Sequence, residues 1–280
     1  MIEVEPRRLQ DSEPLTLRAV VLDWAGTTVD YGSRAPITAI LAAFDEAGFP
    51  VTEAEARQPM GRAKRDHLQT LLAIPEVAAR WRDAKGRPSE ESDIDYLYEN
   101  FLRVQAGCVA EHSGLIPGCL EAIASCREMG LKIGSSTGYT RELLAAVAER
   151  ACGEGYTPDV MLSADDVSPG RPAPWLCVEN ARRLGVYPMA SVVKVDDTPA
   201  GVAAGRNAGA WSVGVVQSGN EVGLTLEAFD ALAPERREAA VVQACERLTK
   251  AGAHFLIDTI AELPAVVERI NEKLVQGERP

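Results

Sequence analysis

Short apolar runs recur along the chain and alternate with segments in which apolar residues repeat at helical spacing. The runs lie at residues 17–23 (LRAVVLD), 131–136, 159–163, 191–197, 211–216 and 253–258 (AHFLID). Their length and apolar content predict buried strands. The intervening segments, such as 141–150 (RELLAAVAER) and 234–252, predict amphipathic helices. This alternation predicts an α/β fold with a doubly wound parallel sheet.

Residues 34–114 break the alternation. Their apolar spacing is helical at 37–48, 53–73, 76–84 and 93–112, and no convincing buried strand occurs among them. We therefore expect a helical unit of residues 34–114 inserted after the first strand. The main domain is expected to combine residues 1–33 and 115–280.

Charge limits the partners of the protein. The 280 residues include 41 Asp and Glu against 29 Lys and Arg, a formal net charge of −12. An acidic surface repels nucleic acid and anionic lipid, so neither is expected as a partner. It also repels an anionic substrate. A site for a phosphate or phosphonate must therefore supply positive potential locally.

Cysteine usage and the N-terminus indicate a cytoplasmic location. The six cysteines form no C-x-x-C pair, and most lie in apolar runs, where a reduced thiol behaves as a small hydrophobe. Residues 1–18 lack the apolar core of a signal peptide. No run of 18 apolar residues occurs, so no membrane span is expected.

Polar side chains follow several predicted strands, where ligands of doubly wound sheets bind. Asp23 ends the first strand and precedes a Gly/Thr turn, a geometry that presents a carboxylate for attack beside backbone amides. The same spacing also fits an aspartate that only caps a turn. Asp196 and Asp197 end a later strand, and paired carboxylates there suit a hard cation such as Mg²⁺.

Lys64 is a candidate nucleophile in the inserted unit. If the chain is helical from about residue 60, Met60, Lys64 and His67 share one helix face. An apolar neighbour and an imidazole can lower the pKa of the lysine and free its amine for attack. The pattern alone fits a solvated lysine better, because most lysines lie at the surface.

Two further segments suit an anion. Residues 135–140 (SSTGYT) follow a strand and offer hydroxyl and amide donors, although Thr140 also fits the N-cap of the next helix. Residues 169–175 (PGRPAPW) form a rigid loop with one arginine, Arg171, whose guanidinium suits bidentate contact with a phosphonate. On its own, such an arginine is more often a surface residue.

Taken together, the motifs resemble those of the phosphonoacetaldehyde hydrolase family in the haloacid dehalogenase superfamily. The matching strings are DWAGTTVDYGS-x-AP, P-M-G-x-x-K-x-D-H, T-G-Y-T-R and G-R-P-x-P-W, and the resemblance covers nearly the whole chain. In phosphatases of the superfamily the first motif reads D-x-D-x-T, and its second Asp protonates the leaving oxygen. Ala25 stands at that position here, as is usual in the family.

The resemblance implies a Rossmann-like core with an inserted α-helical cap, and hydrolysis of a carbon–phosphorus bond. Asp23 would be the nucleophile that attacks phosphorus, Lys64 would form a Schiff base, and His67 would assist proton transfer. Mg²⁺ would be held by Asp23, Asp197 and the Ala25 carbonyl. Related enzymes form homodimers through the cap. The positions that would contact the phosphonate substrate are Met60, Gly61, Thr137, Gly138, Tyr139 and Arg171.

The sequence departs from the family pattern near the metal site. Family members often read G-D-T-x-x-D, whereas this chain reads D-D-T-P-A-G, with Gly201 at the last position. Asp196 is expected to compensate, either directly or through water. Ser33 replaces a cysteine that is common in the first motif. The alternative function is a phosphomonoester phosphatase of the same superfamily, which Ala25 disfavours.

Overall fold

The structure, a computed structural model, describes residues 15–280. The expectation that residues 1–18 form no signal peptide falls mostly outside these residues. Within that range a six-stranded sheet has the order β3-β2-β1-β4-β5-β6, and every pair is parallel. The strands are β1 (Ala19–Leu22), β2 (Lys132–Ser136), β3 (Val160–Leu162), β4 (Val192–Asp196), β5 (Trp211–Val215) and β6 (Phe255–Ile257). Each predicted strand is present, and the predicted fold class is confirmed.

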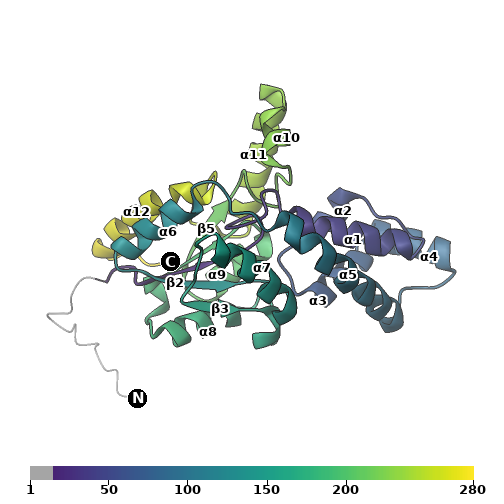
Figure 1. Cartoon of the computed structure of the whole chain (residues 1–280), viewed down its shortest axis with the longest axis horizontal. Coiled ribbons are helices and arrows are strands. Elements are labelled where there is room, and N and C mark those ends of the chain that lie inside the picture. Colours follow the sequence, from purple (N-terminus) through teal and green to yellow (C-terminus); the bar gives the residue numbers. More distant parts are fainter. Residues whose placement is uncertain (1–14) are drawn as a thin grey trace, which may run out of the picture.

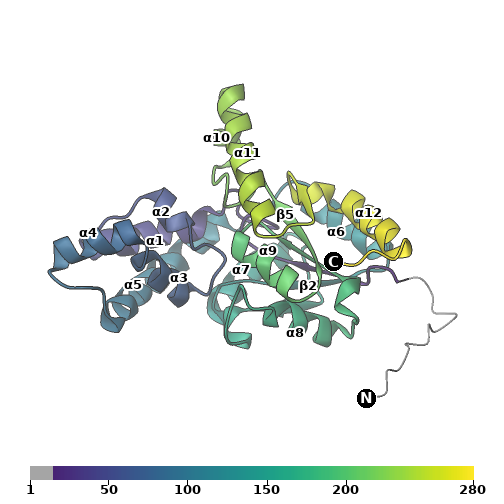
Figure 2. The same cartoon turned by 180° about the vertical axis from the view of Figure 1, so that it is seen from behind.

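Helices cover both faces of the sheet, so its central strands are buried on both sides. Helices α6 (Cys119–Glu128) and α12 (Leu263–Val275) pack together on one face, and α8 (Trp175–Leu184) and α9 (Pro199–Asn207) pack together on the other (Figures 1 and 2). The other elements of this part are α7 (Arg141–Gly153), α10 (Leu226–Asp230), α11 (Pro234–Lys250) and short 3₁₀ turns at Ala164–Asp166, Met189–Ser191 and Ile260–Glu262. Helix α11 projects from the body of the molecule.

The Thr140 hydroxyl accepts a hydrogen bond from the Leu143 amide and caps α7, as the sequence predicted for this residue.

Five helices lie between β1 and α6, to one side of the sheet (Figure 1). They are α1 (Arg34–Glu46), α2 (Glu53–Arg57), α3 (Lys64–Leu72), α4 (Pro75–Lys85) and α5 (Glu91–His112). The long helices α1 and α5 pack along each other through buried side chains such as Ile40, Phe44 and Phe101. Residues 34–114 are all described, and they contain no strand. The division into a core and a cap of residues 34–114 stays a prediction.

The prediction of one continuous helix over residues 53–73 is wrong, because the structure has two helices there. Helix α2 ends at Arg57 and α3 begins at Lys64, with turns between them. Gly61 in these turns has φ +87°, in the left-handed region that glycine adopts without strain. An added Cβ there would lie 2.2 Å from the Thr198 hydroxyl oxygen. Met60 therefore does not share a helix face with Lys64, and periodicity could not reveal this turn.

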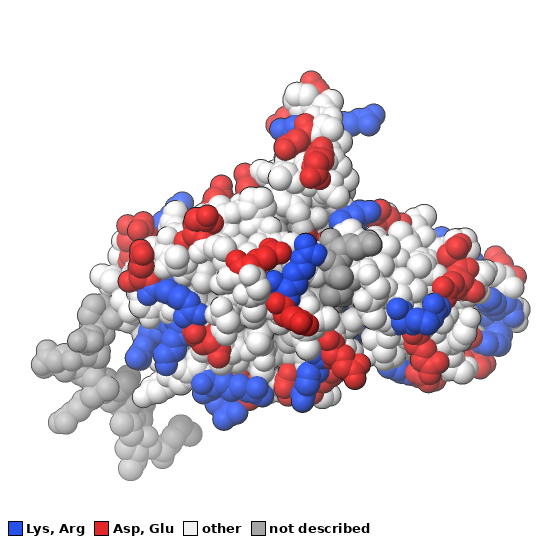
Figure 3. Space-filling model, viewed as in Figure 1, with Lys and Arg blue, Asp and Glu red and all other residues white. Residues whose placement is uncertain are grey.

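Charged side chains of both signs are interspersed over the molecular face in Figure 3. The excess of acid is thus spread over the surface and not gathered in one patch on this face. Among residues 15–280, no helix is long and apolar enough to cross a membrane.

Candidate active site

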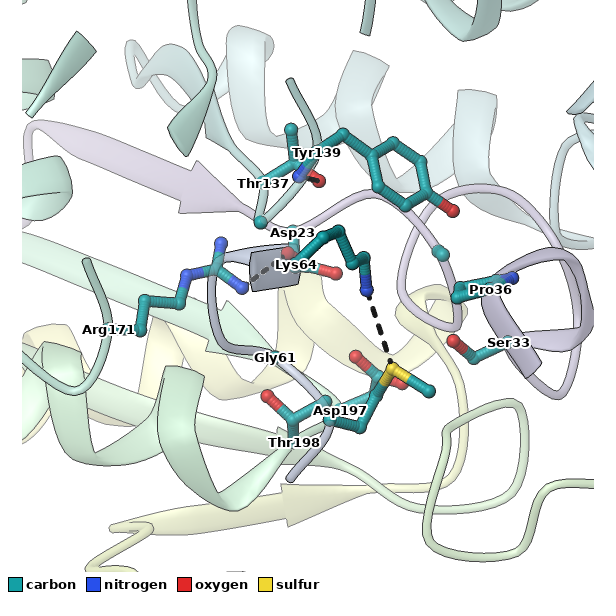
Figure 4. Close-up of a pocket in the computed structure, with 13 residues that line it drawn as sticks. Asp23, Ser33, Pro36, Gly61, Lys64, Thr137, Tyr139, Arg171, Asp197 and Thr198 are labelled. Carbon is teal, nitrogen blue, oxygen red and sulfur yellow. Dashed lines mark hydrogen bonds and ion pairs between the residues drawn. The ribbon is translucent and has the colours of Figure 1, made fainter. Parts of the chain in front are cut away.

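The ends of three neighbouring strands meet at one cavity. Asp23 follows β1, Thr137 follows β2, and Asp197 follows β4. Because β1 lies between β2 and β4, the cavity is at the point where the strand order reverses, the usual ligand site of such sheets. The lining residues are Asp23, Ala25, Ser33, Pro36, Met60, Gly61, Lys64, Thr137, Gly138, Tyr139, Arg171, Asp197 and Thr198 (Figure 4). Of the predicted site residues, His67 and Asp196 are absent from this lining.

The cavity is formed by both parts of the chain. Lys64 and Met60 come from the helical unit, while Asp23, Thr137 and Arg171 come from the sheet and its loops. The cavity has a volume of about 20 Å³, and one water molecule needs roughly 10–15 Å³ by the same measure. The cavity must therefore widen to admit a substrate larger than water.

Three carboxylates lie close together at the cavity, and two of them, those of Asp23 and Asp197, line it. Ligand atoms of Asp23, Asp196 and Asp197 lie within 4.8 Å of one another, and all three residues are buried. Burial and the neighbouring carboxylates raise the pKa of Asp23, and that of Asp197 rises well above its ordinary value for the same reasons. Oδ2 of Asp197 accepts a hydrogen bond of 2.8 Å from the Asn220 amide, whereas its Oδ1 has no hydrogen-bond partner in the described part of the chain. This set of hard, mutually repelling oxygens fits a divalent cation.

Arg171 forms ion pairs with two of these carboxylates. Its Nη1 lies 2.8 Å from Asp23 Oδ1 and 3.1 Å from Asp196 Oδ2. Its Nη2 donates to the carbonyl and hydroxyl oxygens of Ser136 at 2.7 and 2.9 Å. Burial would lower the pKa of Arg171, but the Asp196 and Asp23 carboxylates raise it above its ordinary value. The guanidinium is thus a fixed positive charge inside an acidic protein.

Lys64 opens helix α3 and points into the cavity (Figure 4). Its ammonium donates a 3.7 Å hydrogen bond to Met60 Sδ and lies 5.5 Å from the centre of the Tyr139 ring. Burial lowers the pKa of Lys64 to about 8, against an attraction to Asp23 that acts the other way. A substantial fraction of the amine is therefore neutral, and nucleophilic, near physiological pH.

Known proteins match this chain over nearly its full length. A family model described as haloacid dehalogenase-like hydrolase matches residues 17–209. A phosphonoacetaldehyde hydrolase of Syntrophobacter fumaroxidans is 44% identical over 94% of this chain and 95% of its own, and one of Bacillus cereus is 42% identical over 92% and 98%. The chain belongs to the phosphonoacetaldehyde hydrolase family of haloacid dehalogenase-like hydrolases.

Solved structures agree with this family assignment. A phosphonoacetaldehyde hydrolase-like protein from Oleispira antarctica has a TM-score of 0.93 and 40% identity, and the match covers 99% of this chain and 100% of that one. The resemblance read from the motifs is confirmed, and the chain is a hydrolase.

His67 lies one helical turn beyond Lys64 in α3 and is fully buried. Its Nε2 is 2.9 Å from the carbonyl oxygen of Ala56. Because a carbonyl only accepts, Nε2 carries the proton and Nδ1 holds a lone pair, which has no partner among the described residues. Burial and the Lys64 charge lower the pKa of His67 well below 6.5, so the ring is neutral.

Sequence reasoning missed several residues around the cavity. Ser33, Pro36 and Thr198 line it without having been predicted as site residues. Lys194, one strand residue before Val195, is fully buried and 2.8 Å from Asp196 Oδ2. A lysine inside the apolar string VVKVDD was the one available signal, since lysine is almost never fully buried unless paired.

Proposed function

We propose that this enzyme hydrolyses the carbon–phosphorus bond of phosphonoacetaldehyde and releases acetaldehyde and phosphate. The observation that carries the proposal is one buried cavity shared by the Asp23 carboxylate and the Lys64 amine, whose pKa is lowered to about 8. The two groups come from different parts of the chain, and the reaction needs both. The names of the related enzymes also support it.

The carbon–phosphorus bond requires an electron sink, because direct cleavage would leave a poorly stabilised carbanion. In the proposed reaction the neutral Lys64 amine condenses with the aldehyde, and water leaves as an iminium forms. The Asp23 carboxylate then attacks phosphorus in line. The electron pair of the breaking bond moves into the iminium and gives an enamine. Asp23 becomes an aspartyl phosphate in the same step.

Two hydrolyses complete the cycle. The enamine takes up a proton at carbon, and water then hydrolyses the resulting iminium to acetaldehyde and free Lys64. A second water cleaves the aspartyl phosphate and regenerates the Asp23 carboxylate. His67 Nδ1, the unpartnered lone pair of a neutral ring, is suited to assist proton transfer beside Lys64, directly or through water.

We propose Mg²⁺ as the cofactor, held by Asp23, Asp197 and the carbonyl oxygen of Ala25. The unpartnered Asp197 Oδ1 and the raised pKa values of Asp23 and Asp197 support a cation between them. When bound, the ion offsets repulsion between the attacking carboxylate and the phosphonate.

The remaining cavity residues suit the two ends of the substrate. Arg171, Thr137 and Gly138 are proposed to orient the phosphonate with N–H and O–H donors. Met60, Gly61 and Tyr139 surround the Lys64 amine and keep water from it, which favours its neutral form. Association as a homodimer through the cap and a cytoplasmic location stay predictions.

The competing function is hydrolysis of phosphate monoesters. That reaction needs an acid to protonate the leaving alkoxide, and the side chain at the second position of the first motif is the methyl group of Ala25. The enamine formed from Lys64 needs no such acid at that position. The buried, partly neutral lysine would also have no role in ester hydrolysis.

A coupled acetaldehyde assay tests the proposal. Purified enzyme, Mg²⁺ and phosphonoacetaldehyde are mixed with alcohol dehydrogenase and NADH, and phosphate is measured in parallel. We expect Mg²⁺-dependent NADH loss equal to the phosphate released. No turnover from a folded sample, or much faster hydrolysis of p-nitrophenyl phosphate, would reject the proposal and favour the esterase.

A further inference from the structure

Lys194 is a buried charge that the proposed reaction does not use. Its side chain is fully buried in β4, and it is not among the residues that line the cavity. Its ammonium lies 2.8 Å from Asp196 Oδ2 and donates to the Val195 carbonyl at 3.2 Å. Packing alone would not select a lysine here, because an apolar residue of similar volume avoids the cost of burying a charge.

The charge of Lys194 reaches the cavity through two ion pairs. Asp196 Oδ2 is shared by Lys194 at 2.8 Å and Arg171 at 3.1 Å, and Arg171 in turn lies 2.8 Å from Asp23. The other oxygen, Asp196 Oδ1, accepts hydrogen bonds from the amide and hydroxyl of Thr198 at 3.1 and 2.7 Å. Asp196 is therefore held in place while one of its oxygens faces two cations.

The donors of Arg171 are nearly all engaged. A guanidinium has five N–H groups, two on each Nη and one on Nε. Nη1 faces the Asp23 and Asp196 carboxylates, Nη2 donates both protons to Ser136, and Nε alone has no partner in the described part of the chain. A bidentate contact with a phosphonate needs two donors. At least one present contact must therefore be given up when the anion binds.

We propose that Lys194 is a positioning residue. It keeps the Asp196 carboxylate paired with a cation when Arg171 releases this carboxylate and binds the phosphonate instead. The inference rests on the proposed role of Arg171 as a phosphonate ligand. Asp196 is the partner that can be released, because a second cation already holds it. Without Lys194, the same exchange would leave a buried carboxylate without a cation, which is strongly unfavourable.

The ammonium and the stem of Lys194 have separable roles. The stem fills space beside α9, since a Cβ added at Gly205 would lie 2.7 Å from Lys194 Cβ. Methionine keeps a linear apolar stem and removes the charge, so Lys194→Met tests the ammonium with little change in packing. Lys250→Met, at an exposed position of α11, is the matched control.

The first measurement is the dissociation constant of inorganic phosphate, by calorimetry in the presence of Mg²⁺. We expect Lys194→Met to weaken phosphate binding by about 10- to 100-fold, in the range of couplings within a buried network. KM for phosphonoacetaldehyde should rise by a similar factor, while kcat stays within about threefold. Unchanged phosphate binding in folded Lys194→Met would overturn the proposal.

The second measurement repeats the substitution where Asp196 carries no charge. Asp196→Asn keeps an oxygen for Thr198 and removes the anion that competes for Arg171. In this background Lys194→Met should alter phosphate binding by less than about threefold, because no carboxylate needs to be retained. An equal loss in both backgrounds would instead assign Lys194 a direct attraction for phosphate, and would overturn the exchange.

The variants in the Asp196→Asn background also test the role of Lys194 if Lys194→Met alone does not fold. The double variant removes both charges of the pair, and its comparison with Asp196→Asn gives the same test. The readout is separate from the proposed activity. A wild-type enzyme that binds phosphate but leaves phosphonoacetaldehyde intact would reject the activity alone, whereas one that binds no phosphate at millimolar concentration would reject the role of Lys194.

Discussion

The carboxylate of Asp196 occupies the space next to the backbone of Gly201. A Cβ atom added at Gly201 would lie 1.9 Å from Asp196 Cγ and 2.0 Å from each of its carboxylate oxygens. The carboxylate cannot swing away easily, because Arg171, Lys194 and Thr198 hold it from three sides. Positions 196 and 201 therefore have room for only one acidic side chain. The family pattern G-D-T-x-x-D has glycine at the position of Asp196 and the acid at the position of Gly201, the reverse of this chain.

Gly201→Asp alone should be strongly destabilising. The added side chain overlaps Asp196, and overpacking of this kind costs about 1–3 kcal/mol before the like charges are counted. The exchange Asp196→Gly with Gly201→Asp should recover most of the free energy of unfolding, measured in urea. Gly153→Asp, at a glycine of α7 with open space around it, is the control. Equal stability of the single variant and the exchange would contradict the steric argument.

Magnesium should stabilise the folded enzyme through Asp197. A ligand at about a hundredfold excess over its dissociation constant adds about 2.7 kcal/mol to the free energy of unfolding. Asp197→Asn should lose this increment. Without metal it should be more stable than the wild type, because burial and the carboxylates of Asp23 and Asp196 disfavour the ionised form. Thermal unfolding with and without Mg²⁺ measures both effects, and Glu272→Gln, at an exposed position, should behave as the wild type.

Replacement of Lys64 by arginine should abolish turnover while the fold is retained. Arginine keeps the positive charge, but a guanidinium stays protonated and forms no iminium with an aldehyde. Borohydride reduction in the presence of phosphonoacetaldehyde should label the wild type on Lys64, detected by mass spectrometry, and leave Lys64→Arg unlabelled. Substantial turnover by this variant would exclude the Schiff-base route.

Stability should depend on pH through Lys64. Its folded-state pKa is about 8, below the ordinary value of 10.5, so between these values the folded chain has released a proton that the unfolded chain keeps. The free energy of unfolding therefore rises with pH across this window; the full gain is present above about 10.5 and is lost as pH falls from there to about 8. The difference of about 2.5 between the pKa values corresponds to about 3 kcal/mol. Urea denaturation below and above the window should show it in the wild type and not in Lys64→Met.

His67→Gln should separate a role in proton transfer from a role in packing. The glutamine amide can replace Nε2 as the donor to Ala56, so the thermal midpoint should change little. The lone pair of Nδ1 is lost, and kcat should fall about 10²- to 10⁴-fold, the usual contribution of a general acid or base. A kcat within threefold of the wild type, in a folded sample, would leave His67 a structural residue.

The sheet and the strand-end residues were predictable because they depend on local patterns. Apolar runs that end in Asp23 and Asp197 identify both the strands and the edge at which their side chains meet. The turn at Gly61 was not predictable in this way. The turn depends on a close approach to Thr198, which lies more than a hundred positions away. A contact between such distant residues leaves no trace in the local periodicity of the sequence.

The pairing of Lys194, Asp196 and Arg171 shows the same limit. Lys194 and Asp196 are two residues apart in a strand and therefore point to the same face of the sheet, but the sequence does not show which face that is. Nor does it show that the loop before α8 brings Arg171 to the same face, as the structure does. Arg171 could be predicted because it lies in a string that matches the family, whereas Lys194 lies outside the matching strings.

The contact between Gly61 and Thr198 links access to the cavity with the reactivity of Lys64. The turn that contains Gly61 leads directly into helix α3, and a second close approach joins Gly138 to the carbonyl of Arg62, where an added Cβ would be 2.5 Å away. In the proposed reaction, a movement that parted these contacts to admit an aldehyde would also rehydrate the lysine, which would then regain its proton. A stray aldehyde would meet an ammonium, and the amine would become free only after the turn had returned to Thr198.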